Sequence, residues 1–260
     1  MDSTGRRATH SLDCMNNNLL RALRPDDFRL LEPLLTEWHG ERGQILHEPG
    51  ETVRHVHFPC GPSLISYLVV LEDGRAIETA LIGREGAAGG IVSQGRLPAY
   101  GRAEVQFPGE FLRIGSAELE AAKLRSLTLR HLFARYADCL MAHIFQSVAC
   151  NAAHSIEQRT AKWLIAAMER TGDRRIPLTQ EQLSAMMGVG RSYISRILQS
   201  LKASGMIATR RGGLVVNDVD GLHRLACGCN EATRRHFDDV LQGVYPSDEE
   251  TNMMNGAPRG

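Results

Sequence analysis

The sequence has no run of 18 consecutive apolar residues, so no segment is typical of a transmembrane helix. Its amino terminus also lacks the apolar core of a secretory signal peptide, and we therefore expect a cytoplasmic protein. The six cysteines follow no regular spacing, which favours free thiols over a disulfide framework. The formal net charge is zero, so the chain as a whole does not indicate a strongly charged partner.

The zero net charge conceals an uneven distribution along the chain. Between residues 170 and 211, eight Lys and Arg accompany two acids, which gives a local charge of +6. Between residues 217 and 250, three Arg accompany eight acids, which gives −5. Because a local excess of positive charge is what attracts nucleic acid, this asymmetry points to a binding segment near residues 170–211.

Residues 178–216 predict a helix, a tight turn, a second helix and a short hairpin. Thr179 and Gln182 form a capping box at the first helix start, and Gly188-Val189-Gly190 interrupts the helical pattern. The second helix, at about residues 190–203, has apolar residues at spacings of three and four, which predicts one buried face. Gly205 stands where a helix C-cap belongs.

The other face of this second helix carries arginines and small hydroxyl residues, and two further arginines occupy the hairpin turn. Arginine can bridge guanine O6 and N7 or bind phosphate, and small hydroxyls allow a close approach to DNA. A helical hairpin with a solvated outer face would look similar, but the arginine-tipped hairpin favours DNA binding. The predicted DNA-binding residues are Thr179, Gln180, Arg191, Ser192, Tyr193, Ser195, Arg196, Gln199, Arg210 and Arg211.

The segment from Thr179 to Val216 resembles the winged helix-turn-helix of the Crp/Fnr superfamily of bacterial transcription regulators. The matching positions are Leu178-Thr179, Glu181 to Leu183, Gly188, Arg191-Ser192, Ile194 to Leu198, Leu201, Gly205 and Ile207. The resemblance implies that Arg191, Ser192, Ser195 and Arg196 contact bases. Many members carry glutamate where this chain has Ser192. Because serine accepts from cytosine N4 less selectively than glutamate, the usual operator of the family is not expected.

Residues 42–114 consist of short apolar runs separated by Gly and Pro, which predicts an antiparallel sandwich or roll. A helical lead-in is predicted over Leu19–Trp38. The predicted strands are Gln44–His47, Val53–Phe58, Leu64–Leu71, Ala76–Ile82, Ala103–Phe107 and Phe111–Ile114. The resemblance implies an α+β fold: an N-terminal antiparallel, jelly-roll-like β-roll, a long dimerisation helix and a C-terminal winged helix-turn-helix.

A glycine-rich stretch in the predicted roll is the candidate effector site. Glycines let a backbone approach phosphate, although turns use glycine for ordinary reasons as well. The cyclic-AMP site of the family also requires a glutamate and an Arg-Ser pair, where this chain has Ala88 and Gly101-Arg102. Cyclic AMP is therefore not expected, and neither an effector nor a cofactor is identified. The candidate residues are Gly83, Gly86, Gly89, Gly90 and Arg102.

Ser116–Thr171 contains no Gly and no Pro, which predicts helix throughout. A helix from Ser126 to Cys150 would be about 37 Å long. Its apolar face predicts a parallel two-helix dimer interface, with packing on its own domain as the alternative. The predicted interface residues are Leu129, Leu132, Phe133, Tyr136, Leu140, Ile144 and Val148.

A hinge is predicted at residues 151–154, where the apolar pattern stops and Ser155 with Gln158 forms a new capping box. The predicted divisions are a tail (1–18), the roll with its lead-in (19–124), the dimerisation helix (125–152), the winged helix-turn-helix (153–245) and a second tail (246–260).

Two groups of His and Cys suggest metal binding: His223, Cys227, Cys229 and His236 near the carboxy terminus, and His55, His57 and Cys60 in the roll. The Cys-x-Cys spacing, without a second close ligand pair, is unlike a standard zinc site. We therefore predict no metal and interpret Leu222–Val240 as a packing helix with buried thiols. The ligand set of an Fnr-like iron–sulfur sensor is also absent, because only Cys14 lies near the amino terminus.

Two functions remain. The first is a homodimeric transcription regulator, not an enzyme, that binds a two-fold symmetric operator and has RNA polymerase as a possible further partner. The second is a small-molecule-binding or enzymatic β-roll with a structural C-terminal module. The roll contains no metalloenzyme spacing and no nucleophile motif, which favours the first.

Overall fold

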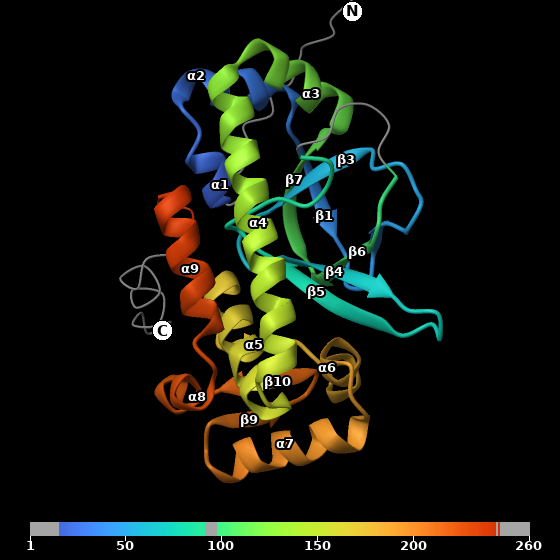
Figure 1. The fold of residues 1–260 in the computed structure, drawn as a ribbon, viewed down its shortest axis with the longest axis vertical. Helices are drawn as coiled ribbons and strands as arrows, with labels where there is room; N and C mark the ends of the chain where they lie inside the picture. The colour runs from blue at the N-terminus through green and yellow to red at the C-terminus, as the bar shows by residue number, and fades with distance from the viewer. Residues whose placement is uncertain (1–15, 92–97, 243, 245–260) are drawn as a thin grey trace, which may run out of the picture.

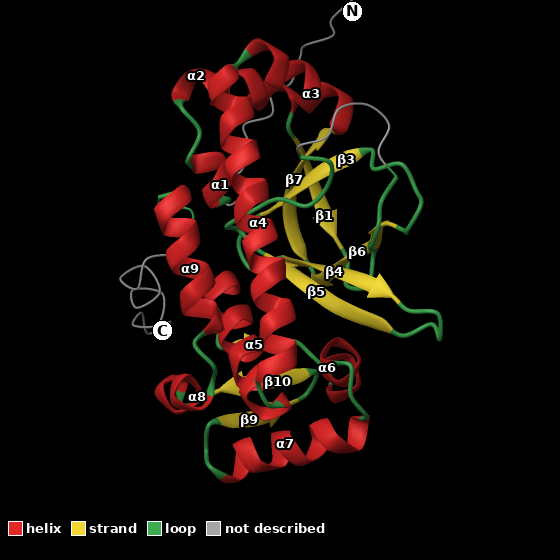
Figure 2. Cartoon of the chain, in the orientation of Figure 1, coloured by secondary structure: helices red, strands yellow, loops and turns green. Residues whose placement is uncertain are grey.

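The computed structural model describes residues 16–91, 98–242 and 244 of the 260-residue chain. It contains an N-terminal β-roll, a long helix alongside it, and a helical module with a small sheet at the far end of the molecule (Figures 1 and 2). The predicted α+β fold class is confirmed. None of the described helices is long and apolar enough to cross a membrane.

The helical lead-in is shorter than predicted. It comprises α1 (Asn18–Arg21), α2 (Pro25–Leu31) and a 3₁₀ turn (Glu32–Leu34), and strand β1 (Thr36–Gly40) follows at once. The sequence pattern missed β1 because the strand forms by pairing with a distant segment, so that Trp38 lies opposite Phe111. The predicted tail is also too long, since Asn17 is buried and caps α1.

The β-roll consists of two antiparallel sheets. One has the order β1-β7-β3 and the other the order β2-β6-β4-β5. The remaining strand bounds are β2 Ile45–His47, β3 His55–Pro59, β4 Leu64–Val70, β5 Ala76–Ile82, β6 Arg102–Phe107 and β7 Gly109–Gly115. Each of the six predicted strands is present, with shifted ends in all but β5, because Gly and Pro mark the turns between them locally.

The predicted continuous helix is three helices: α3 (Ser116–Arg125), α4 (Leu127–Ala153) and α5 (Ile156–Thr171). The first break lies at Ser126, which has extended dihedrals and caps α4 through its hydroxyl. The hydroxyl also bonds to the Asp27 carboxylate of α2, so a tertiary contact places the break. The predicted capping box of Ser155 and Gln158 is confirmed at the start of α5.

Helix α4 packs one face against the roll. Leu129, Phe133 and Tyr136 on this face are buried in a core that includes residues of β3 and β7. These three side chains are therefore not available to a second chain, and their place in the predicted dimer interface is corrected. Leu132 and Leu140 are half-buried against the same chain, whereas Ile144 and Val148 are exposed as the prediction requires.

The C-terminal module comprises α5, α6 (Gln180–Met187), α7 (Arg191–Ala203), α8 (Val219–Leu225) and the sheet β8-β10-β9. Its strands are β8 Arg175–Ile176, β9 Ile207–Arg210 and β10 Gly213–Val216. The predicted helix over Leu222–Val240 is interrupted, because α8 ends at Leu225 and α9 begins at Cys229. Helix α9 (Cys229–Val240) then runs back beside α4 towards α1 (Figure 1).

The C-terminal module is docked on the roll of the same chain. Leu64 and Leu81 of the roll share one apolar core with Trp163 of α5. The Trp163 indole N–H donates to the Glu78 carboxylate at 2.7 Å. Further along α5, Arg170 pairs with Glu85 at 2.7 Å, with both side chains almost fully buried. Separation of a buried ion pair leaves an uncompensated charge in the protein interior, which is strongly destabilising. These contacts therefore hold α5 against the roll.

Desolvation raises the pKa of the Glu78 carboxyl from 4.5 to about 7, against the opposing effect of hydrogen bonds from Ser66 and Trp163. A carboxyl whose pKa is higher in the folded protein than in the unfolded chain stabilises the fold fully at a pH below its pKa in the unfolded chain. This stabilisation is lost as the pH rises through the pKa of the folded protein. We predict that the thermal midpoint of the parent protein, measured relative to that of Glu78→Gln, decreases as the pH is raised from about 5 to about 8. Parallel pH profiles for the two proteins would contradict this assignment, and the exposed Glu72→Gln serves as the control.

Candidate nucleic-acid interface

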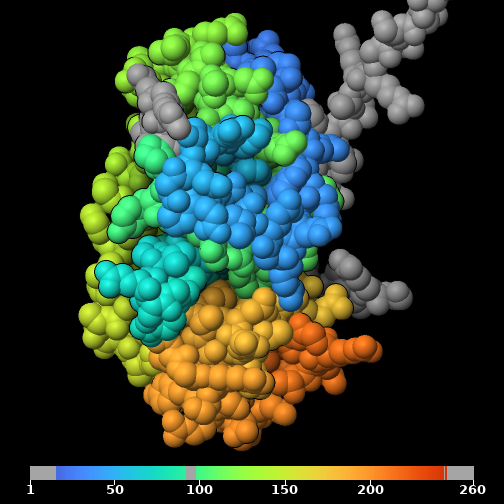
Figure 3. Space-filling view, turned by 90° about the vertical axis from the view of Figure 1, so that its right-hand side faces the viewer, coloured from blue at the N-terminus to red at the C-terminus, as the bar shows by residue number. Residues whose placement is uncertain are grey.

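The predicted two-faced helix is present as α7. Ile194, Ile197, Leu198 and Leu201 are buried in the C-terminal module, as the spacing of the apolar residues predicts. The opposite face points to solvent at the end of the molecule away from α1 and α2 (Figure 1). In Figure 3 the module forms the lower end of the molecule, directly below the strands β4 and β5.

The turn before α7 has the geometry that its glycine predicts. Gly188 has a φ of +69°, in the left-handed region that side chains avoid, and its N–H bonds to the carbonyls of Ala185 and Ser184. A Cβ at Gly188 would also lie 3.1 Å from Ile77 of β5, so the turn faces the roll. At the other end of α6, the predicted capping box of Thr179 and Gln182 is confirmed.

All ten predicted DNA-binding residues lie at the surface, with Gln180 and Ser195 half-buried and the others exposed. The Arg196 guanidinium lies over the Tyr193 ring at 5.2 Å. This cation–π contact holds the arginine along the outer face of α7 before any ligand arrives. The contact between Tyr193 and Arg196 could have been predicted from the sequence, because residues three apart in a helix are neighbours.

The hairpin beside α7 places two cations at its tip. Gly213 pairs with Arg210, so the turn consists of Arg211 and Gly212. Both arginines are exposed. A helix that enters the major groove, with an arginine-tipped hairpin beside it, can contact base edges with the helix and phosphates with the hairpin.

The exposed surface of residues 170–211 carries less positive charge than the total of +6 for this segment suggests. Arg170 is buried in its pair with Glu85, and Arg175 lies 3.5 Å from Asp173. The exposed cations in this segment, other than Arg175, are Arg174, Arg191, Arg196, Lys202, Arg210 and Arg211. Four of these six are predicted DNA-binding residues, so the remaining charge is concentrated on the candidate interface.

Among the described residues of the glycine-rich stretch, two of the predicted effector glycines have a packing role. A Cβ at Gly83 would meet Arg170 at 2.8 Å, and one at Gly86 would overlap the Tyr136 hydroxyl, so both glycines permit close packing of helices. Gly90 is buried, and Arg102 pairs with Glu48 at 2.9 Å. Gly83 and Gly86 are corrected from effector contacts to structural positions, and the roles of Gly90 and Arg102 stay predictions.

The backbone N–H groups of Ala87 and Ala88, between Gly86 and Gly89, already form hydrogen bonds. Ala87 exchanges hydrogen bonds with the Tyr136 hydroxyl. Ala88 exchanges backbone hydrogen bonds with His57 of β3. Because these N–H groups already have acceptors, they are not available to cradle a phosphate.

Gly89, another predicted effector residue, lines a cavity that has a volume of about 350 Å³ and lies between β4, β5 and α4. Its lining contains no Lys, Arg, Asp or Glu among the described residues. His47 is one lining residue, and burial lowers its pKa despite the raising effect of Glu51 and Glu48. Tyr67, whose hydroxyl accepts from the Gly89 N–H, has its pKa raised to about 12 by burial. The lining is therefore uncharged at neutral pH.

Of the two groups of His and Cys that suggested metal binding in the sequence, the structure brings ligands together only near the carboxy terminus among the described residues. Burial lowers the pKa of His57 to about 3, and its ring packs against Trp38 at 5.1 Å, as a core histidine does. Near the carboxy terminus, Cys227 and Cys229 do converge with two ligands, but the partners are Cys150 and His154. His223 and His236 are not members of that group. Among the described residues it is the one group with metal-ligand geometry.

Comparison with known families identifies the C-terminal module. Residues 158–225 match the family model of the Crp-like helix-turn-helix domain. The module therefore contains a Crp-like helix-turn-helix domain. The match begins within α5 and ends at the last residue of α8, so it includes α6, the Gly188 turn, α7 and the hairpin.

Several solved structures have the same overall fold. FixK2 from Bradyrhizobium japonicum matches with a TM-score of 0.63 and 17% identity, over 74% of this chain and 98% of its own. TTHB099, a CRP-family transcriptional regulator from Thermus thermophilus, gives 0.61 and 21%, over 74% and 96%. A regulator assigned to the Crp/Fnr family from Eubacterium rectale gives 0.58 and 18%, over 81% and 98%. The chain thus has the fold of these three solved structures, with the Crp-like helix-turn-helix domain at residues 158–225.

A comparison with curated protein sequences gives no match.

Arg196→Ala tests the candidate interface. We expect affinity for a selected operator to fall by roughly 5- to 150-fold, since one arginine–guanine contact is worth about 1–3 kcal/mol. Arg224→Ala is the matched control, because Arg224 is an exposed arginine of the same module away from α7. Fluorescence anisotropy at fixed salt measures both. Equal affinities for Arg196→Ala and Arg224→Ala would contradict the assignment.

Proposed function

We propose that the protein regulates transcription as a homodimer that binds two-fold symmetric operator DNA through α7 and the β9–β10 hairpin. The observation that carries this proposal is the exposed Arg and Ser face of α7, with two arginines beside it, on a Crp-like domain. A regulator, rather than an enzyme, is the function that this surface supports. A contact with RNA polymerase stays a prediction from the resemblance.

In this proposal each α7 lies in the major groove. Arg191, Ser192, Ser195 and Arg196 read base edges, while the hairpin arginines bind phosphates on the flank. Ser192 is short and exposed, so its hydroxyl discriminates cytosine less than a carboxylate would. The operator should therefore differ from the usual one of the family at the base pair that Ser192 faces.

Dimerisation is assigned to the face of α4 that its own chain leaves uncovered. Leu127, Met141 and Val148 lie at multiples of seven residues, and Phe145 is adjacent on the same face. Leu127, Phe145 and Val148 are each 63–65% exposed, which is unusual for large apolar side chains. Two such helices in parallel would bury this stripe and relate the two copies of α7 by a two-fold axis.

The effector that fits the cavity is small, apolar and uncharged. A cyclic nucleotide needs a cation or free N–H groups for its phosphate, and the described lining offers neither a cation nor a free cradle. Leu140 and Ile144 of α4 line this cavity, and Ile144 lies beside the proposed dimer stripe. A ligand there can bias the position of α4, and with it the separation of the two copies of α7.

Phe145→Glu tests the dimer. We expect it to convert the protein to a monomer at micromolar concentration, because a carboxylate would be desolvated in the interface. Arg135→Glu is the control, since Arg135 is exposed on another face of α4. Sedimentation velocity measures both variants. A monomeric parent protein, or a dimer that Phe145→Glu leaves intact, would exclude this interface.

A further inference from the structure

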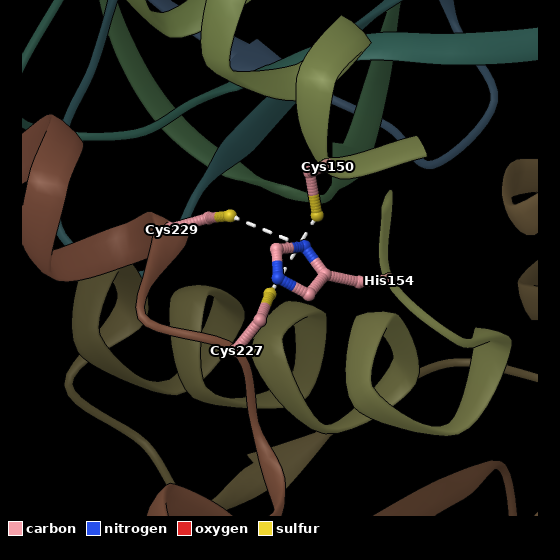
Figure 4. A group of neighbouring side chains, drawn as sticks. All are labelled: Cys150, His154, Cys227 and Cys229. Atoms are coloured by element: carbon pink, nitrogen blue, oxygen red, sulfur yellow. Dashed lines mark hydrogen bonds between the residues drawn. The ribbon is translucent and has the colours of Figure 1, made fainter. Parts of the chain in front are cut away.

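Four metal-ligand side chains from two distant parts of the chain meet beside the hinge. Cys150 lies in the last turn of α4, and His154 follows that helix directly. Cys227 and Cys229 lie in the connection between α8 and α9 and at the start of α9. The one Nδ1 or Nε2 atom and the three Sγ atoms all lie within 4.8 Å of one another (Figure 4).

Two of the six distances between these atoms have the values expected for a tetrahedral ion. The Cys150 and Cys227 sulfurs are 3.6 Å apart, and the Cys229 sulfur is 3.6 Å from Nδ1 of His154. With zinc–sulfur bonds of about 2.3 Å and zinc–nitrogen bonds of about 2.05 Å, a tetrahedron has S–S edges of about 3.8 Å and S–N edges of about 3.6 Å. The two measured pairs share no atom, so they are opposite edges of such a tetrahedron.

The chemistry of the four ligand atoms indicates which metal ion they would bind. Three thiolates and one imidazole are soft to borderline ligands, and the Cys₃His combination is a recurrent structural zinc site. Four protein ligands leave no position open, which is the arrangement of a structural site and not a catalytic one. All three cysteines are buried and His154 is half-buried, so the three sulfurs are shielded from solvent.

The surroundings suit a bound ion of this kind. The Gln146 side-chain amide donates to the Cys229 sulfur at 3.1 Å, as an outer partner of a metal thiolate does. A divalent ion with three thiolates carries a net charge of −1. The Arg159 guanidinium, one turn into α5, is close enough to Cys150 and Cys227 to oppose the charge that such a site would carry.

We propose that Cys150, His154, Cys227 and Cys229 bind one Zn²⁺ ion per chain. Binding of the ion to three thiols and a neutral imidazole releases three protons, so that three Zn–S bonds and one Zn–N bond replace three S–H bonds. The ion would tie the end of α4 to the start of α9, across the break at His154-Ser155 where α5 begins. It would thereby hold the DNA-binding module at the end of the proposed dimer helix.

The first test measures metal in the purified full-length protein after growth with zinc and extensive dialysis. Mass spectrometry of the elements should give about one zinc per chain. Cys150→Ser and Cys229→Ser should each lower the content at least tenfold. Cys139→Ser should keep it, because Cys139 is a buried thiol of the same helix that does not belong to the group. Arg196→Ala should also keep it, which separates this proposal from DNA binding.

A second measurement does not depend on the folding of any variant. Replacement of zinc by Co²⁺ in the parent protein should give the intense visible bands of a tetrahedral ion and a thiolate charge-transfer band in the near ultraviolet. A zinc content below about 0.1 per chain, with no such cobalt spectrum, would overturn the proposal. A Cys150–Cys227 disulfide in the metal-free protein, or iron as the resident metal, would overturn it as well.

Removal of the ion should also destabilise the protein. Because the site forms only in the folded chain, a chelator should lower the thermal midpoint of the parent protein and leave that of Cys229→Ser unchanged. Equal shifts in both proteins would show that the chelator acts elsewhere.

Discussion

The contact between Tyr136 and the Gly86–Ala87 backbone determines how the rest of the molecule is arranged. Tyr136 is fully buried, and its hydroxyl both donates to the Ala87 carbonyl and accepts from the Ala87 N–H. Gly86 provides the space, because a Cβ there would overlap the hydroxyl. A buried hydroxyl without these partners would cost free energy, so the contact specifies one rotation of α4 about its axis.

That rotation assigns a function to each face of α4. One face fills the core with Leu129 and Phe133, and a neighbouring face closes the cavity with Leu140 and Ile144. The outward face leaves Met141 and Phe145 uncovered. At its carboxyl end the same helix delivers Cys150 to the proposed zinc site. The cavity, the proposed dimer stripe and the metal site thus share one rigid element, through which a change at one can reach the others.

The position of α7 depends on contacts made by α5 and α9. Helix α5 is held on the roll by Trp163 with Glu78 and by Arg170 with Glu85. Helix α9 returns along α4, and Phe237 joins the same core as Tyr136. The C-terminal module is therefore attached at both of its ends, and any ligand that moves it must weaken contacts of the roll, of α4, or of both.

Local signals in the sequence were sufficient for α6, the Gly188 turn, α7 and the β9–β10 hairpin. The capping boxes, the Gly188 turn and the apolar face of α7 depend on residues within a few positions of one another. The rotation of α4 was not predictable in this way, because the helix is apolar on two faces and periodicity does not say which one meets its own chain. Likewise β1 and the Ser126 break depend on Phe111 and Asp27, which are distant in sequence. The ligands Cys150 and His154 were missed for the same reason, since only the fold brings them to Cys227.

In vitro selection of bound DNA, followed by measurement of the number of chains on the selected duplex, tests the central claim most directly. The account predicts a palindromic sequence with half-site centres about 10 base pairs apart, or a multiple of this, and two chains on each duplex. An asymmetric selected sequence with one chain per duplex, or no enrichment over random DNA, would contradict it.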